Sequence, residues 1–126
     1  MKISIVVPTY NSATYVAEAI QSILIQNYRD FEAIICDNES TDNTISIIKN
    51  KLIGENIEKF KFFVRSDIGV ADALNYGFSR SSGKILCWLN SDDKFFDENV
   101  FSKIVKNFQS NHNIDYIVGN FINIDS

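Results

Sequence analysis

The sequence predicts an α/β protein built on a mostly parallel, twisted sheet with helices on both faces. Two observations support this fold class. Short runs rich in β-branched and aromatic residues alternate along the chain with longer segments whose apolar residues recur at helical spacing. Such alternation arises when each helix crosses back over the sheet to join parallel strands. The chain has 126 residues, of which 45% are hydrophobic and 22% charged, which suffices for one domain with a packed core.

The first half of the chain contains two predicted strand–helix pairs. Residues 3–7 form a β-branched run, which is typical of a buried strand. Residues 13–26 are predicted as an amphipathic helix because apolar side chains recur on one face, at Val16, Ala19, Ile20, Ile23 and Leu24. A second strand is predicted at 31–36. The helix predicted at 44–52 has three candidate N-caps, which are Ser40, Thr41 and Asp42.

The second half continues the alternation and ends in a fifth strand. Strands are predicted at 61–65 and 84–89, and helices at 71–81 and 98–109. The pair Ser82-Gly83 closes the first of these helices. Residues 114–118 are predicted as the last strand, which Gly119 ends.

Composition argues against several classes of protein. The net charge is −4 and the pI about 4.9, without the basic patch that duplex nucleic acid requires, so no nucleic-acid partner is expected. The apolar runs are far shorter than the roughly 20 residues of a membrane span, and the N-terminal segment is too short for a signal peptide. We expect a cytoplasmic protein, with any attachment to the inner face of the membrane made by other parts of a longer protein. Cys36 and Cys87, in strand-like runs, are expected to be buried free thiols.

Polar segments follow the first four predicted strands, at residues 8–11, 37–42, 66–69 and 90–93. Ligands of open parallel sheets bind beyond the carboxyl ends of the strands, so these segments are expected to converge on one edge. Neither a Gly-x-Gly-x-x-Gly turn nor a Walker A lysine loop follows the first strand, which argues against a dinucleotide or P-loop site.

Asp92 and Asp93 directly follow a hydrophobic strand, although two adjacent carboxylates repel each other. Carboxylates can face a phosphate only across a cation. Oxygen ligands suit Mg²⁺ or Mn²⁺, which bind through one or two carboxylates plus phosphate oxygens and water. The pair therefore predicts a metal site completed by a diphosphate. The alternative is that Asp92, Asp93 or Asp97 caps the helix that follows.

Asp37 and Tyr10 end neighbouring strands and form a candidate nucleobase site. A carboxylate at a strand end can accept a hydrogen bond from a ring N–H such as N3 of uracil, and a tyrosine ring can stack on the base. The alternatives are that Asp37 caps the next helix and that Tyr10 is a surface aromatic.

Two runs of the sequence resemble family 2 glycosyltransferases: ISIVVPTYNSATYVAEAIQSILIQNYRDFEAIICDNESTDNT and DIGVADALNYGFSRSSGKILCWLNSDD. Members of this family have the GT-A fold, which is Rossmann-like, and transfer a sugar from a nucleotide-diphosphate donor. The resemblance covers nearly the whole chain. It implies that residues 1–126 are a single domain, the N-terminal donor-binding part of such an enzyme, truncated at its C-terminus.

The resemblance also implies roles for individual residues. Pro8, Thr9 and Tyr10 would line the base pocket, with Asn11 beside them and Asp37 bonding the base of a donor that is expected to be a UDP-sugar. Asp92 and Asp93 resemble the metal-binding Asp-x-Asp motif, which would hold Mg²⁺ or Mn²⁺. Four more candidates match a family motif that reads Asp-Lys-Gly-Ile-Tyr-Asp-Ala-Met-Asn-Lys-Gly; they are Asp67, Gly69, Asp72 and Asn75.

The chain departs from the family pattern at several positions. Asn90 stands where many relatives have the first aspartate, so most weight falls on Asp92. Ile68 replaces the usual lysine and Ala71 the usual tyrosine; Arg65 is near enough in sequence to replace the lost cation. Asn38-Glu39 replaces the commoner Asp-Gly or Gly-Gly, which leaves the donor preference open.

The implied reaction is inverting transfer of the sugar to a saccharide or lipid-linked acceptor, as in polysaccharide biosynthesis. A carboxylate base would deprotonate the acceptor hydroxyl. The resemblance implies that this base lies beyond residue 126, so the fragment alone is expected to be inactive. One alternative is a non-catalytic nucleotide-binding module or inactive fragment. A remote alternative is a receiver domain, which needs an acidic pair after the first strand, where this chain has Pro8-Thr9-Tyr10-Asn11.

The C-terminal segment is predicted to self-associate. The predicted strand 114–118 and the apolar tail residues Phe121, Ile122 and Ile124 have no following element to pack against. An exposed strand edge of this kind invites pairing with a second copy. The alternative is a tail that folds back on its own domain.

Overall fold

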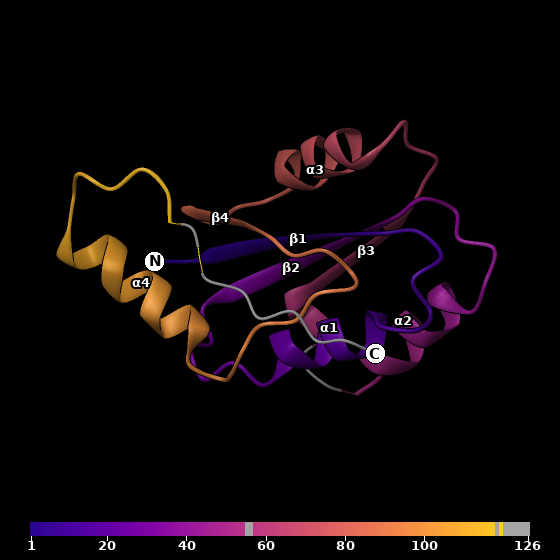
Figure 1. Cartoon of the computed structure of the whole chain (residues 1–126), viewed down its shortest axis with the longest axis horizontal. Coiled ribbons are helices and arrows are strands. Elements are labelled where there is room, and N and C mark those ends of the chain that lie inside the picture. Colours follow the sequence, from indigo (N-terminus) through magenta and orange to yellow (C-terminus); the bar gives the residue numbers. More distant parts are fainter. Residues whose placement is uncertain (55–56, 118, 120–126) are drawn as a thin grey trace.

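The computed structural model describes residues 1–54, 57–117 and 119. Strands and helices alternate as predicted (Figure 1), and their bounds are β1 Ile3–Thr9, α1 Val16–Leu24, β2 Phe31–Asp37, α2 Thr44–Leu52, a short 3-10 helix η1 Ile57–Lys59, β3 Phe60–Val64, α3 Val70–Ser79, β4 Ile85–Trp88 and α4 Val100–Ser110. In the described part of the chain, no helix has the length and apolarity that crossing a bilayer requires.

The four strands form one parallel sheet in the order β3-β2-β1-β4, which confirms the predicted fold class. In register, Ile3 of β1 lies beside Phe31 of β2, and Thr9 beside Asp37. The carboxyl ends of these strands therefore reach the same edge of the sheet. Strand β4 pairs with β1 only as far as Trp88, beside Val6, so the segment after β4 leaves the sheet earlier than its neighbours do.

Helices cover both faces of the sheet, which places the core in two layers. Alternate residues of β1, including Ile5 and Val7, pack with α1, α2 and α4 in the larger core cluster. Val6 points the other way and packs with Ala73 of α3 in the smaller one. Figure 1 shows α3 alone on its side of the sheet, with α1 and α2 opposite. The fully buried β1 thus forms the centre of the molecule.

The predicted fifth strand is wrong over the described residues. The chain is not in a strand at residues 114–117, while Val118 and the tail residues Phe121, Ile122 and Ile124 lie outside the described residues. Tyr116 is 80% exposed. An apolar run becomes a strand only where a neighbouring strand supplies backbone partners. Residues 114–117 are not among the strands that pair in the described sheet.

The two cysteines are free, as predicted. Cys36 lies beside Pro8 and packs on the α3 face, whereas Cys87 lies beside Ile5 and packs against the opposite core cluster. Since β1 separates their strands and they point to opposite faces, a disulfide between them is geometrically excluded. Cys36 is fully buried as expected, but Cys87 is only half-buried. Burial raises the pKa of each thiol to about 11.

Candidate functional site

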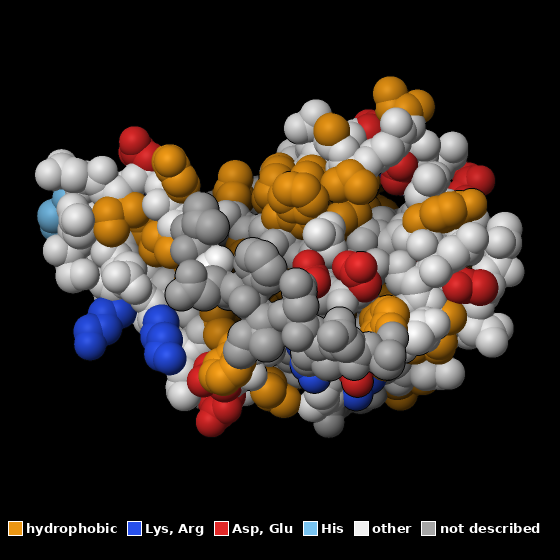
Figure 2. All heavy atoms as spheres, in the orientation of Figure 1, with side chains coloured by type: hydrophobic (Ala, Val, Ile, Leu, Met, Phe, Trp, Pro, Cys, Tyr) orange, Lys and Arg blue, Asp and Glu red, His pale blue; other side chains and the backbone are white. Residues whose placement is uncertain are grey.

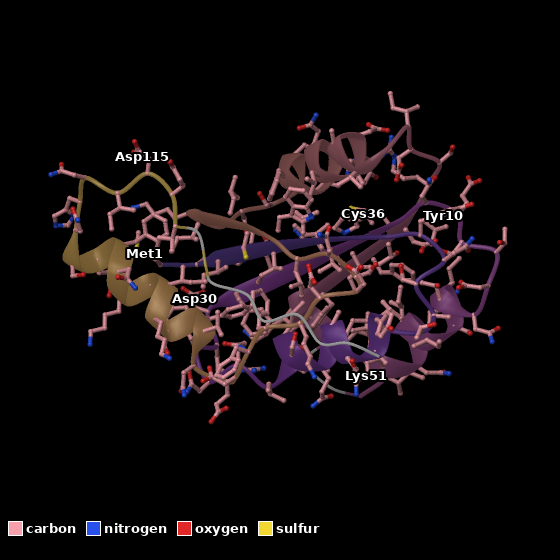
Figure 3. The ribbon with its side chains drawn as sticks, viewed as in Figure 1. Met1, Tyr10, Asp30, Cys36, Lys51 and Asp115 are labelled. Atoms are coloured by element: carbon pink, nitrogen blue, oxygen red, sulfur yellow. The ribbon has the colours of Figure 1, made fainter. Side chains whose placement is uncertain are left out.

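A cavity of about 640 Å³ opens at the carboxyl edge of the sheet. Figure 3 shows Tyr10 at this end of the molecule and Met1 and Asp30 at the other. Segments that follow β1, β2, β3 and β4 all line the cavity, which confirms the expected convergence. The lining residues are Pro8, Thr9, Tyr10, Asn11, Ser12, Thr14, Tyr15, Asn38, Asp67, Gly69, Val70, Ala73, Asn90, Ser91 and Asp92.

The connection after β1 forms one wall of the cavity. Tyr10 is 58% exposed there, so its ring is free to meet a planar ligand. Asn11 adopts a left-handed conformation with φ of 46°. Its side-chain oxygen accepts hydrogen bonds from the backbone amides of Thr41 at 2.9 Å and Asp42 at 3.4 Å. Asn11 thereby joins the connections that follow β1 and β2.

Asp37 lies at the end of β2 and is fully buried. Its Oδ1 accepts hydrogen bonds from the hydroxyls of Thr9 and Ser40, each at 2.6 Å, and its Oδ2 accepts one from the Ser40 amide at 2.7 Å. It does not cap α2, because that helix begins at Thr44, whose amide donates to Asp42 instead. Asp37 does not line the cavity, and its contact with a base stays a prediction.

The connection between β3 and α3 forms a second wall of the cavity. Asp67 Oδ1 accepts a hydrogen bond from the Gly69 amide at 2.9 Å, in a turn where Gly69 has φ of 133°. Few residues other than glycine adopt this conformation. The Asp67 amide in turn donates to the side chain of Asn38 at 2.9 Å. Asp67 and Gly69 line the cavity, as the predicted site requires.

Asp72, Asn75 and Arg65 lie away from the cavity lining. Asp72 Oδ2 accepts a hydrogen bond from the Ile68 amide at 3.1 Å and lies 3.7 Å from Nη2 of Arg65. The Arg65 guanidinium also lies over the Tyr76 ring, 4.2 Å from its centroid. Arg65 therefore does not place its charge in the cavity in this arrangement, and Asp72 acts locally at the start of α3.

The segment after β4 supplies the last wall. Asp92 lines the cavity, whereas Asp93 does not. The Asp93 amide donates to the carbonyl of Asn90 at 3.0 Å, which closes a tight turn. Neither aspartate caps α4, because that helix begins at Val100, its N-cap residue is Asn99, and the Asn99 amide donates to Asp97 at 2.9 Å. The structure thus removes the capping alternative for the Asp92-Asp93 pair.

The cavity is acidic. Its charged lining residues are Asp67 and Asp92, and no lysine or arginine lines it in the described part of the chain. On the face drawn in Figure 2, acidic side chains gather on the side of the strand ends, and the most prominent lysine or arginine side chains project near α4. Among the described residues, no group of three or more His, Cys, Asp or Glu side chains could hold a metal ion by itself. The donor set fits an ion such as Mg²⁺ or Mn²⁺ that takes one or two carboxylates and completes its shell with ligand oxygens and water.

Comparison with known proteins identifies the family. The model of Glycosyl transferase family 2 matches residues 4–126. The chain belongs to glycosyl transferase family 2. It is 34% identical to an uncharacterized glycosyltransferase of Nostoc sp. over 99% of its own length, and 32% identical to glycosyltransferase GlyG of Streptococcus pneumoniae over 98%. It spans 40% of the length of each of these curated relatives.

Solved structures agree with this membership in family 2. The fold is similar to that of residues 1–349 of S. aureus TarS in complex with UDP-GlcNAc, with a TM-score of 0.79, 26% identity, and coverage of 89% of this chain and 32% of that TarS chain. It is also similar to the mannosyltransferase PcManGT of Pyrobaculum calidifontis in complex with GDP-Man and Mn²⁺. The TM-score is 0.79 and the identity 25%, and the match covers 84% of this chain and 32% of the PcManGT chain. The fold is therefore GT-A, as the sequence predicted.

Several cavity residues of this family 2 domain escaped sequence reasoning. Ser12, Thr14 and Tyr15 line the cavity but lie outside the polar segments that were expected to form the site. Asn38 and Ser91 lie within those segments and line the cavity, but neither was assigned a role in binding. Each lies next to a predicted strand end or at the start of the following helix. Extending the polar segment 8–11 as far as residue 15 would have included Ser12, Thr14 and Tyr15.

Proposed function

We propose that residues 1–126 bind the nucleotide-diphosphate sugar of a glycosyltransferase, with UDP-sugar as the expected donor and a divalent metal between donor and protein. The single observation that carries this proposal is the charge of the cavity, whose only charged lining residues in the described part of the chain are carboxylates. A diphosphate cannot approach them without a cation. The ligands in the titles of the two similar structures, UDP-GlcNAc and GDP-Man with Mn²⁺, support this ligand class.

Asp92 would hold the metal, with Asp93 beside it in the same turn. When bound, the ion would neutralise charge that develops on the leaving diphosphate. Tyr10 would stack on the base from the β1 side of the cavity. Asp37, buried at the end of β2, would hold Thr9 and Ser40 in place. A direct hydrogen bond from an N–H of the base to its Oδ2 would require the residues that cover Asp37 to move, because Asp37 does not line the cavity.

We propose that the complete reaction requires residues beyond those of this chain. We propose inverting transfer to a saccharide or lipid-linked acceptor, with a carboxylate base beyond residue 126 that deprotonates the attacking hydroxyl. The support for this division is that the chain spans 40% of its curated relatives. Self-association through the C-terminal segment stays a prediction.

Titration calorimetry of the 126-residue chain tests the proposal. UDP is expected to bind more tightly than UMP, and only with Mn²⁺ or Mg²⁺ present, because a diphosphate offers a divalent ion more oxygen ligands and more negative charge than a monophosphate does. The same titrations with a chelator form the control. Equal binding of UDP with and without chelator would rule out the metal bridge, and no binding under any condition would rule out the donor site.

A further inference from the structure

The hydroxyls of Ser12 and Ser91 lie 2.6 Å apart at the cavity wall. Ser12 belongs to the connection after β1, which carries Tyr10, and Ser91 to the connection after β4, which carries Asp92. The two connections are far apart in sequence, and the two strands stop pairing at Val6 and Trp88. Beyond that point, this side-chain contact joins the two walls directly.

The hydrogen-bond pattern around Ser12 makes it a junction between three connections. Its backbone amide donates to Thr44 Oγ1 at 2.7 Å, which ties it to the start of α2. Its hydroxyl lies 3.2 Å from the carbonyl oxygen of Tyr10, to which it can donate. A serine hydroxyl has one proton, so if Ser12 donates to Tyr10, Ser91 must donate to Ser12. This arrangement uses each hydroxyl proton once.

We propose that the Ser12–Ser91 hydrogen bond holds the turn that carries Asp92 against the connection that carries Tyr10. The distance between Asp92, which would hold the metal, and Tyr10, which would stack on the nucleobase, would thereby be fixed. This inference rests on the proposed donor-binding function. Asp92 has no hydrogen-bonded side-chain partner of its own among the described residues; the turn around it is held by the Asn90–Asp93 backbone contact and by Ser91. Ser12 and Ser91 are therefore positioning residues, which act through Asp92 and Tyr10.

The test compares Ser12→Ala, Ser91→Ala and the double variant with Ser91→Thr, which keeps a hydroxyl, and with Ser102→Ala as a matched control. Ser102 lies on α4, and its hydroxyl donates only to the nearby Asn99 carbonyl. Two quantities are measured on the 126-residue chain: amide hydrogen exchange of a peptide that covers residues 90–93, without ligand, and the Mn²⁺ concentration that half-saturates UDP binding.

Loss of either hydroxyl is expected to speed exchange at residues 90–93 and to raise the half-saturating Mn²⁺ concentration about 3- to 10-fold, the range for one net hydrogen bond. The double variant is expected to match Ser12→Ala, because Ser12→Ala already removes the contact that Ser91→Ala removes. Ser91→Thr and Ser102→Ala are expected to behave like the parent chain. Additive effects, or unchanged exchange in Ser91→Ala, would overturn the proposal. If the parent chain does not bind UDP at all, the donor-binding function fails, and the exchange data still decide whether the contact holds the turn.

Discussion

The carboxylate of Glu32 accepts hydrogen bonds from both the backbone amide and the hydroxyl of Ser82, at 2.5 and 3.1 Å. Glu32 lies on β2 and is 5% exposed. Ser4 of β1 donates to the same oxygen at 2.7 Å, and the ammonium groups of Lys61 and Lys2 lie 3.2 and 3.7 Å from the other oxygen. A single buried charge thus ties the connection between α3 and β4 to the sheet.

Replacing Glu32 by glutamine is expected to lower the free energy of unfolding at pH 7 by on the order of 2–3 kcal/mol. Burial by itself would raise the pKa of Glu32, but hydrogen bonds from Ser82, Ser4 and Lys61 outweigh it and lower the pKa from 4.5 to about 2. The substitution leaves these donors without a charged partner. Urea unfolding of both proteins at pH 7 measures the difference.

The hydrogen bonds to Glu32 also make the stability of the folded protein depend on pH. The pKa of Glu32 is lower in the folded protein than in the unfolded chain. As the pH falls, the Glu32 carboxylate is therefore protonated first in the unfolded chain. The stabilisation is present above pH 4.5 and is lost as the pH falls toward 2. The stability gap between the parent chain and Glu32→Gln is expected to close over this range. Glu58→Gln, at an exposed position of η1, serves as the control. A gap that stays constant between pH 5 and pH 2.5 would contradict the assignment.

Gly77 sets how closely α3 approaches the sheet. A Cβ atom at this position would lie 2.5 Å from Cγ1 of Val6, which is fully buried in the centre of β1. Gly77→Ala is therefore expected to destabilise the protein by about 1–3 kcal/mol, although alanine is the better helix former. Thermal or urea unfolding measures the effect. Adding Val6→Ala is expected to recover part of the loss. Gly119→Ala, where a Cβ meets nothing within 4 Å among the described residues, is the control. A stabilised Gly77→Ala variant would show that α3 is free to move away.

Much of the fold and of the cavity follows from local sequence pattern. The runs that form β1, β2, β3 and β4 are apolar throughout or nearly so. Because the strands are parallel, the polar residues that follow them, such as Asn38 and Asp67, all lie at the carboxyl edge of the sheet. The error at residues 114–117 has the opposite cause. Their apolar character is local, but pairing depends on a neighbouring strand, and that cannot be read from the segment itself.

The contacts that individual side chains make were harder to predict than the places of the residues in the fold. Arg65 lies near the predicted site in sequence, yet it pairs with Asp72 and stacks on Tyr76. Asp37 stands at the predicted strand end, yet its carboxylate is occupied by Thr9 and Ser40. The Ser12–Ser91 contact joins connections whose distance depends on where β4 leaves the sheet. These features depend on three-dimensional packing, which residue type and spacing do not specify.

The two thiols are expected to react slowly in native buffer, and Cys36 more slowly than Cys87. Burial raises the pKa of both to about 11, so at pH 8 only about one thiol in a thousand is the reactive thiolate. Cys36 is also fully covered, whereas Cys87 is half-buried. Labelling with a thiol-reactive chromophore, followed by peptide mass spectrometry, measures each rate. Complete labelling of Cys36 within the time needed in denaturant would contradict its position under α3.

Asp92 and Asp93 are expected to contribute unequally to metal-dependent binding. Asp92 lines the cavity, whereas Asp93 does not, and the Oδ2 of Asp93 lies 3.5 Å from the side-chain nitrogen Nδ2 of Asn90, which can donate to it. A direct carboxylate contact to the ion is a charge-assisted interaction, and its loss exceeds that of a longer-range charge. Asp92→Asn is expected to weaken Mn²⁺-dependent UDP binding at least about 10-fold, and Asp93→Asn less than about 3-fold. Both substitutions remove one negative charge at adjacent positions, so each controls for the other's effect on the overall electrostatic field.

Calorimetric titrations at fixed UDP and varied Mn²⁺ separate a weaker metal site from a weaker nucleotide site. Equal losses in the two variants would indicate that the pair acts through its summed charge, and a larger loss in Asp93→Asn would place the ion on the other side of the turn.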